Sequence, residues 1–440
     1  MRPRGAPMKP WLNFLSFITA AGCLGTACTG NIGPVGGLDV GEGGAASASS
    51  TGGIQTTTAE TTADATTVAT SAGVGAGDVG CSGSPDADDD GDGFTELDGD
   101  CDDCNALINP RALELPTVGG EGGASPEPVD DDCDGIADNV PEPCDDGIPL
   151  DDLDPLNAAR AVELCKMSSG PDDWGVVSAA WVMVDGAPPP QQPELLANFH
   201  LGHGILPKFG PNVPPRAGTR LLALSSGTAR TADDEGFESP QGFDKKYEGD
   251  FPEGFPKAPR NCEDLVLAKP SDPTAVEITL RVPSNVRGFA FNVNYVTFDW
   301  PVVCDSFNDY FVAFLSPRPA NLIDGHILFD SERNAMSVNS SFIDVCACPS
   351  GPPCDLDERV YACTRGTREL LGTGFESRAG TSWLVTSAPV EPNTEIKIRW
   401  GAYDAGDHQL DSTGLVDNWR WLTDKDESVI TLPDPPAPQP

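Results

Sequence analysis

Hydrophobic and polar residues alternate along three stretches in the second half of the chain, 276–282, 289–295 and 396–400. Alternation with a period of two places apolar side chains on one face of an extended strand, so each stretch predicts a β-strand. Shorter apolar runs occupy 174–184, 221–224, 310–315, 327–329 and 383–385. Turn-forming residues lie in nearly every gap, and the strands follow one another without helical patterns between them. This organisation predicts a mainly β protein with an antiparallel β-sandwich or jelly-roll-like domain.

A single helical pattern precedes these strands at 154–165. Asp154 can cap its N-terminus, and Pro155 suits the first turn. The residues that recur on one helical face are Ala158, Ala161, Val162 and Cys165. We therefore expect the β-domain to run from 154 to 428, followed by a proline-rich tail at 429–440.

The first 28 residues have the order of a secretory signal, with basic residues, an apolar run and then small residues. The apolar run, 11–18, is shorter than the roughly 20 residues of a membrane-spanning helix. Cys23 and Cys28 each follow a lipobox-like sequence. We expect acylation at Cys28, with Cys23 as the alternative and plain secretion as a further interpretation. Contact with a membrane would then occur only through the lipid anchor, at the outer membrane or cell surface.

Residues 29–80 predict a disordered linker, because 36 of these 52 residues are Gly, Ala, Ser or Thr and none is aromatic. The whole chain of 440 residues has 27 basic and 68 acidic residues, a formal net charge of −41. Such a charge argues against nucleic-acid binding, because phosphates would be repelled.

Acidic residues concentrate at 78–155, where 25 Asp and Glu accompany the single Arg111. Within the expected segment 81–153 the carboxylates are spaced so that several could converge on one ion, and Ca²⁺ accepts six to eight oxygen ligands. The candidate ligands are Asp86, Asp88, Asp90, Asp92, Asp98, Asp100, Asp102, Asp103, Asp130, Asp132, Asp134 and Asp138. An EF-hand loop would need Glu at the twelfth position from Asp86, which is Leu97. A solvated acidic tract without metal is the alternative.

This segment resembles the Asp/Cys-rich metal-binding segments of bacterial surface proteins and, more distantly, the type 3 repeats of thrombospondin. The resemblance is carried by the DxDxDGDG run at 86–93, the DCDD at 100–103 and the DCDG at 132–135. It implies a small calcium-dependent module that contains disulfides. The chain departs from the family pattern at 110–114, where Pro-Arg-Ala-Leu-Glu stands in place of Pro-Gly-Ala-Glu, and in the Gly-rich insertion that follows.

Cysteine parity predicts one bond between the acidic segment and the β-domain. Seven cysteines lie from Cys165 onward, an odd number, so one must pair outside. Cys144 is the nearest partner for Cys165. The other four cysteines of the acidic segment, Cys81, Cys101, Cys104 and Cys133, allow three connectivities, and the six downstream of Cys165 allow fifteen.

The β-domain resembles the choice-of-anchor L family. The resemblance rests on the segments 199–207, 222–230, 242–245, 298–301, 308–311 and 402–419, and it covers about 150–425. It implies an extracellular β-domain held at the surface by an anchor, without an established enzymatic activity.

A second candidate metal site lies near the expected turn between the last strands. Its members are Asp309, Asp404, Asp407, Asp411 and Asp417, and ordinary Asx turns are the alternative. His200 and His203 lie beside glycines, which favours a loop whose histidines hydrogen-bond the backbone. Ser225 and Ser226 lack the surroundings of a hydrolase nucleophile.

We therefore expect a non-catalytic, calcium-binding cell-surface lipoprotein whose β-sandwich has a recognition, adhesion or structural role. The alternative is a secreted hydrolase that acts on polysaccharide or ester substrates. The sequence identifies neither a surface ligand nor a neighbouring envelope protein as the partner.

Overall fold

The computed structural model describes residues 81, 83–117, 127–260, 262, 268–356, 359–424 and 428–435. The described residues do not include the expected signal segment or the linker 29–80. The two candidate acylation sites, Cys23 and Cys28, also lie outside them. Within the described residues, no helix is both long and apolar enough to cross a membrane.

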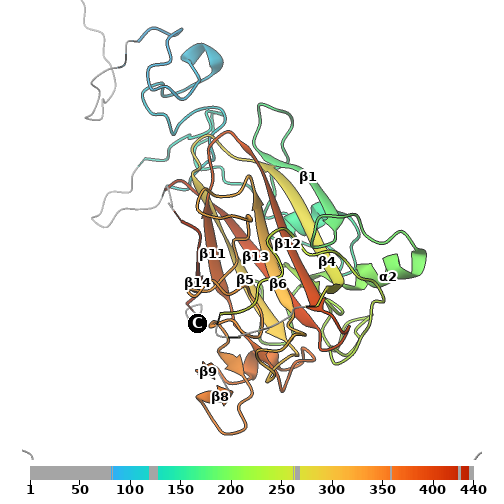
Figure 1. Cartoon of the computed structure of the whole chain (residues 1–440). Helices are drawn as coiled ribbons and strands as arrows, with labels where there is room; N and C mark the ends of the chain where they lie inside the picture. The colour runs from blue at the N-terminus through green and yellow to red at the C-terminus, as the bar shows by residue number, and fades with distance from the viewer. Residues whose placement is uncertain are drawn as a thin grey trace, which may run out of the picture. The chain divides into compact units, whose positions relative to one another are not determined.

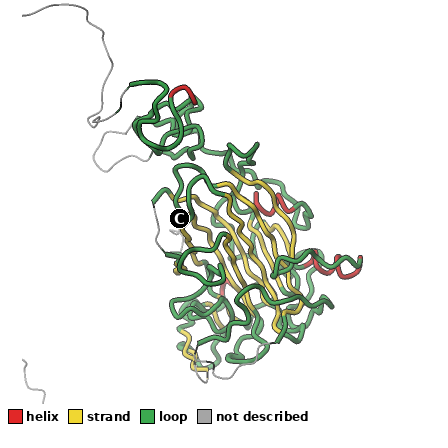
Figure 2. Tube along the Cα trace, turned by 45° about the horizontal axis from the view of Figure 1, so that its top comes forward, coloured by secondary structure: helices red, strands yellow, loops and turns green. Residues whose placement is uncertain are grey.

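Two antiparallel sheets form the body of the β-domain (Figures 1 and 2). The first has the strand order β1 (Gly175–Val182), β4 (Pro270–Arg281), β12 (Glu395–Ala405) and β6 (Tyr310–Ser316). The second has the order β14 (Ile430–Pro433), β11 (Leu384–Pro389), β5 (Gly288–Thr297), β13 (Ser412–Leu422), β3 (Leu221–Ser225) and β2 (His203–Leu206). In this sheet β10 (Ala379–Gly380) pairs with both β5 and β7 (Val345–Cys346). The expected mainly β, antiparallel fold is confirmed.

The other elements are short. They are α1 (Pro155–Arg160), α2 (Pro193–Leu201), the 3₁₀ turns Glu96–Asp98 and Arg368–Leu370, and a hairpin of β8 (Cys354–Leu356) with β9 (Arg359–Tyr361). Asp154 caps α1 as predicted, because its side chain accepts a hydrogen bond from the backbone of Leu156. The helix ends at Arg160, earlier than the pattern suggests, and Glu163 has a left-handed backbone with φ 68° that turns the chain away.

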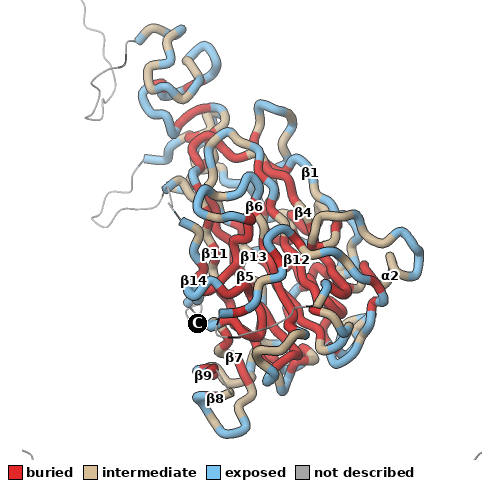
Figure 3. The backbone as a smooth tube through the Cα atoms, viewed as in Figure 1, coloured by how far each residue is buried: buried red, intermediate tan, exposed pale blue. Residues whose placement is uncertain are grey.

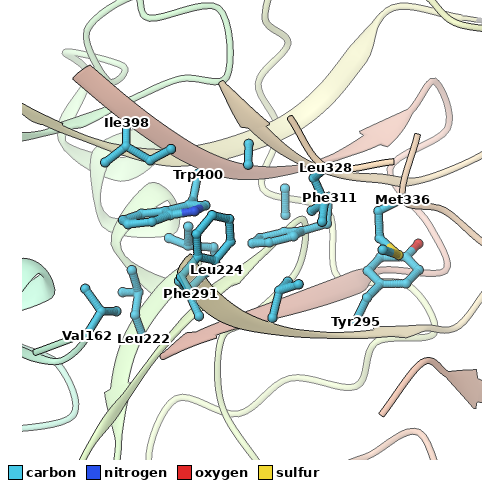
Figure 4. Close-up of a cluster of buried hydrophobic side chains, with 14 of the residues drawn as sticks. Val162, Leu222, Leu224, Phe291, Tyr295, Phe311, Leu328, Met336, Ile398 and Trp400 are labelled. Carbon is cyan, nitrogen blue, oxygen red and sulfur yellow. The ribbon is translucent and has the colours of Figure 1, made fainter. Parts of the chain in front are cut away.

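Apolar side chains from both sheets meet in one shared core (Figure 4), and the central strands are largely buried along their length (Figure 3). Phe291 of β5 lies edge-on to Trp400 of β12, with ring centroids 5.3 Å apart. Trp419 of β13 stacks on Phe289 at 4.3 Å and meets Trp400 edge-on at 6.0 Å. The alternating residues of 276–282, 289–295 and 396–400 therefore form strands because their apolar faces bury one another across the two sheets.

The sheets extend beyond the predicted elements. β13 combines buried polar and apolar residues and lacks a simple alternation, and β14 begins at Ile430, inside the expected tail. Pairing of β14 with β11 places the end of the β-domain at least five residues beyond 428. The run 327–329 is buried but forms only an isolated bridge at Phe329, because a short apolar run does not by itself distinguish a strand from a buried irregular segment.

The acidic segment is attached to the β-domain by a disulfide and by amide hydrogen bonds. The predicted Cys144–Cys165 bond is present. Asn285, which is fully buried, accepts a hydrogen bond from Leu113 N at 2.8 Å and donates to Leu113 O at 2.9 Å. The Trp174 indole donates to Ala112 O at 3.0 Å. The other disulfides join Cys81 to Cys104, Cys101 to Cys133, Cys262 to Cys304, Cys346 to Cys363 and Cys348 to Cys354.

Gly414 of β13 tests how closely the two sheets pack. A Cβ atom at this position would lie 2.1 Å from the ring of Phe311 on β6, so only glycine fits beneath that ring. Gly414→Ala is expected to lower the free energy of unfolding by about 1–3 kcal/mol through overpacking. Gly242→Ala is the control, because no atom lies within 4 Å of the place that its Cβ would occupy. Denaturant unfolding of the oxidised chain measures both, and equal stability of the two variants would contradict this packing.

Candidate metal centres

Two loops of the acidic segment have the same backbone design. Residues 88–93 read Asp-Asp-Asp-Gly-Asp-Gly, and 130–135 read Asp-Asp-Asp-Cys-Asp-Gly. Gly91 and Cys133, at the fourth position, both have left-handed backbones, with φ 83° and 55°. The final glycines of both loops are also left-handed. The two loops therefore follow the same turn. The sequence alone does not establish this likeness, because the second loop has Cys133 at the position where the first has Gly91.

Backbone amides orient the carboxylates in both loops. In the first, the two oxygens of Asp88 accept hydrogen bonds from Gly91 N at 2.7 Å and Gly93 N at 3.1 Å. In the second, Asp130 accepts from Asp134 N at 3.1 Å and Gly135 N at 2.9 Å. These Asx-type turns hold the first carboxylate of each loop inward, over its own backbone.

The first loop supplies two overlapping groups of ligands. The carboxylate oxygens of Asp88, Asp90 and Asp92 lie within 4.8 Å of one another, and so do those of Asp90, Asp100 and Asp103. Asp90 belongs to both groups. A pair of cations bound here would share this carboxylate, or one cation would draw ligands from both sets.

The second of these groups contains buried oxygen atoms without hydrogen-bond partners. They are one oxygen each of Asp90, Asp100 and Asp103. Burial, together with the neighbouring carboxylates of Asp92 and Asp90, raises the pKa of Asp100 to about 6. A carboxylate that is removed from water without donors is costly, and a cation among the three would offset that cost.

The second loop forms a third group with a residue that sequence reasoning missed. Glu114, which is only 4% exposed, lies with Asp130 and Asp132 within the same 4.8 Å limit. Its carboxylate also accepts hydrogen bonds from Asp131 N at 3.1 Å and Asp132 N at 3.3 Å. The signal is present in the sequence, because Glu114 ends the turn 110–114 between the two acidic loops.

The remaining predicted ligands of this segment lie outside the three groups. Asp86 accepts a hydrogen bond from Ser84, Asp98 from Thr95, and Asp138 from Thr117. Asp102 is exposed, and Asp134 accepts from Ile136 N and Asn139 Nδ2. Acidic groups able to hold a metal are therefore present in this segment, but with a smaller and partly different set of residues than predicted.

Three of the five residues of the second predicted site meet at one end of the sandwich. Asp309, Asp404 and Asp411 are almost completely buried, together with Asp299, which the prediction omitted. Burial raises the pKa of Asp309 and Asp411 well above the ordinary range, and that of Asp404 to about 7. These carboxylates do not form one of the tight three-ligand groups found among the described residues.

Hydroxyl groups from several strand ends surround these buried acids. Ser226 Oγ donates to Asp309 at 3.2 Å, and Ser412 Oγ bonds Thr297 Oγ1 at 2.9 Å. Tyr295 donates to Asp309 O at 3.2 Å. Both oxygens of Asp404 and of Asp411 nevertheless lack hydrogen-bond partners.

The other two predicted members are placed differently. Asp407 is exposed at the turn between β12 and β13, where its charge still helps to raise the pKa of Asp404, whereas Asp417 lies further along β13. Asp417 is six residues beyond Asp411, which on an extended strand corresponds to about 20 Å. The prediction that Asp417 shares the site was therefore wrong, because the chain continues as a strand instead of turning back.

Asp417 instead pairs with Glu163, which follows α1. Both carboxylates accept a hydrogen bond from Asn418 N at 2.7 Å. Two buried carboxylates side by side repel each other when both are charged, so we expect this pair to share a proton. Burial and the charge of Asp417 raise the pKa of Glu163 to about 9.

The neighbouring glycines predicted a loop around His200 and His203, but the structure places both residues in regular elements. His200 is in the last turn of α2, and His203 begins β2. Their ring nitrogens are 2.8 Å apart, and His203 stacks on Trp181 with centroids 3.7 Å apart. The chain passes directly from helix to strand here because Gly202 has ordinary right-handed angles and caps the helix.

Comparisons with known proteins find no match to a protein-family model, a curated protein or a solved structure. The geometry of the chain itself therefore carries the functional argument. The six disulfides among the described residues are typical of exported proteins, since such bonds persist in oxidising compartments.

The Glu163–Asp417 pair predicts a loss of stability as pH rises from mildly acidic to alkaline solution. The folded chain holds the shared proton more tightly than the unfolded chain, whose Glu has a pKa of roughly 4.3. The stabilisation is complete below that value and is lost as pH rises toward the raised pKa of about 9. The contribution of this pair to the melting temperature is therefore expected to fall steadily as pH rises from about 5 to about 9.

Glu163→Gln should flatten that pH dependence, because the amide stays neutral and can still donate to Asp417. Asp146→Asn, at an exposed position, should keep the slope of the parent protein. Scanning calorimetry across the pH range measures both variants. The same slope in Glu163→Gln as in the parent would contradict the shared proton.

Proposed function

We propose that the protein is an exported, non-catalytic, calcium-binding surface protein of the choice-of-anchor L kind, held at the outer membrane by an N-terminal lipid anchor. Its β-sandwich would have a recognition, adhesion or structural role. The observation that carries the proposal is the pair of matching loops at 88–93 and 130–135, with their converging carboxylates.

The ligand chemistry of these loops supports calcium. The three groups offer only carboxylate oxygens, which are the ligands that Ca²⁺ prefers, and backbone carbonyls or water could complete six to eight ligands. The nearby cysteines are paired as Cys101–Cys133 and Cys81–Cys104 and do not offer thiolates to zinc. Because Cys133 lies inside the second loop and Cys101 follows Asp100, one disulfide also joins the two regions of ligands.

A buried asparagine links the first loop to the β-domain. The Asn109 amide nitrogen donates to Asp92 at 2.7 Å, and its oxygen accepts from Ser284 Oγ at 2.6 Å. A cation that orders Asp92 would therefore also order the contact with Ser284. On this proposal calcium relieves carboxylate repulsion and fixes the acidic segment against the sandwich.

The shared carboxylate of Asp90 provides the direct test of calcium binding. The purified chain, stripped of metal with EGTA and dialysed at physiological salt, is titrated with Ca²⁺ in a calorimeter. We expect saturable binding, and we expect Asp90→Asn to remove binding at the first loop and leave the Glu114 site. Asp146→Asn is the matched control, since this exposed aspartate belongs to none of the groups. An absence of binding heat in the parent chain would refute the proposal.

Asn109 provides a separate test of the link to the β-domain. Asn109→Ala removes the bridge between Asp92 and Ser284 but none of the ligands. Calcium should still bind, whereas the rise in melting temperature on adding calcium should be smaller than in the parent chain. Calorimetric titration and thermal unfolding of the same samples separate these effects. An unchanged calcium-induced rise would show that the bridge does not transmit binding to the sandwich.

A further inference from the structure

A second kind of ligand cluster lies where the β12–β13 connection meets the start of β4. It consists of Asp244, Asp272 and His408, whose ligand atoms lie within 4.8 Å of one another. His408 Nδ1 is 2.9 Å from an oxygen of Asp272 and 3.2 Å from an oxygen of Asp244. Both carboxylates therefore face the same ring nitrogen, which bridges them when the imidazole is protonated and can bind a cation between them when it is neutral.

The spacing of these atoms suits a small divalent cation. Ligands about 2.0–2.2 Å from a tetrahedral ion are roughly 3.3–3.5 Å from each other. The two distances from His408 fall slightly below this range, so a small outward displacement would admit the ion. One imidazole nitrogen with two carboxylates is a donor set for a borderline transition metal, in contrast to the all-oxygen groups of the acidic loops.

Two of the three residues have backbones that side-chain-bearing residues seldom adopt. Asp272 has φ 54° and His408 has φ 58°. Asp272 is held in place by Lys245 N, which donates to one carboxylate oxygen at 3.1 Å, and by Tyr247 N, which donates to the other at 3.4 Å. Such fixed, sparsely populated conformations concentrate at sites where the position of a side chain matters.

An independent observation at this end of the sandwich is an excess of buried negative charge. Asp404 pairs in register with Ser271, next to Asp272, and both of its buried oxygens lack hydrogen-bond partners. The buried cation Lys245 donates to Ser225 O at 2.9 Å and Thr274 Oγ1 at 2.7 Å, and its single positive charge acts on Asp272, Asp404 and Asp411 together. A divalent ion beside Asp272 would offset the negative charge that one lysine leaves over.

The cluster is also open to an incoming ion. The side chain of Asp244 is 49% exposed and that of His408 is 23% exposed, whereas Asp272 is fully buried. An ion could therefore arrive from solvent, and water could complete its coordination beside three protein ligands.

We propose that Asp244, Asp272 and His408 form a binding site for a transition-metal ion of the zinc class, separate from the calcium loops. This site does not depend on the proposed function. Its ligands come from three stretches that the fold alone brings together, before β4, within β4 and after β12.

Titration with Zn²⁺ in the presence of saturating Ca²⁺ tests the site. The stripped full chain is first loaded with millimolar Ca²⁺, so that oxygen-only groups are occupied, and Zn²⁺ binding is then measured by calorimetry. We expect one Zn²⁺ site whose affinity falls at least tenfold in His408→Gln and in Asp244→Asn. Asp244 is half exposed, so the second variant tests the site even if replacement of His408 disturbs folding.

Two control variants identify the ligands. Asp90→Asn should keep the Zn²⁺ site, because it changes only the acidic loops. His200→Gln should also keep it, which excludes the His200–His203 pair as the source of the signal. Loss of Zn²⁺ binding in either control, retention of full affinity in Asp244→Asn, or displacement of Zn²⁺ by Ca²⁺ would overturn the proposal. Failure of the calcium experiment would leave this result unaffected, since the two tests use different ions and different ligands.

Discussion

The constraint on which this structure depends is the removal of carboxylates from water. The chain has 68 acidic residues against 27 basic ones, so ion pairs can compensate only a minority of them. A carboxylate out of water needs hydrogen-bond donors, a proton or a cation. The structure uses backbone donors in the acidic loops, and the raised pKa of Glu163 beside Asp417 points to a proton retained by that pair. Cations are the remaining means of compensation, and they are the basis of both metal proposals.

Exposure decides which of these means suits each place. The ligands of the acidic loops lie near the surface, where an ion can enter and leave, and several keep contact with solvent. Asp309 and Asp411 are enclosed by strand ends and hydroxyl groups, where a retained proton satisfies a carboxyl group without any need for an ion to reach it. The cluster at His408 is intermediate, because one ligand is buried and the other two reach solvent. The same residue type thus serves three chemical purposes according to its depth.

The sequence predicts the β-domain well where packing is periodic. The stretch 276–282 alternates because successive side chains face opposite sides of β4, and parity together with proximity in the chain identifies the Cys144–Cys165 bond. It predicts much less where the fold joins distant segments. Glu114 joins Asp130 only because the chain folds back, and Asp417 leaves its predicted partners because β13 continues straight. His408 carries no motif, since its partners lie 136 and 164 positions earlier in the chain.

The junction between the acidic segment and the β-domain follows from the same constraint. Both parts are rich in acidic residues, so a docking surface made of ion pairs would require cations that the chain largely lacks. Asn109 and Asn285 instead connect the two parts through neutral side chains that both donate and accept hydrogen bonds. The ion pair Arg111–Asp172 adds one charged contact at the same junction. Repulsion between the two parts remains, however, and a cation bound in the loops would reduce it at its source without adding another side chain. Docking and ion binding should therefore reinforce each other, because each lowers the electrostatic cost of the other.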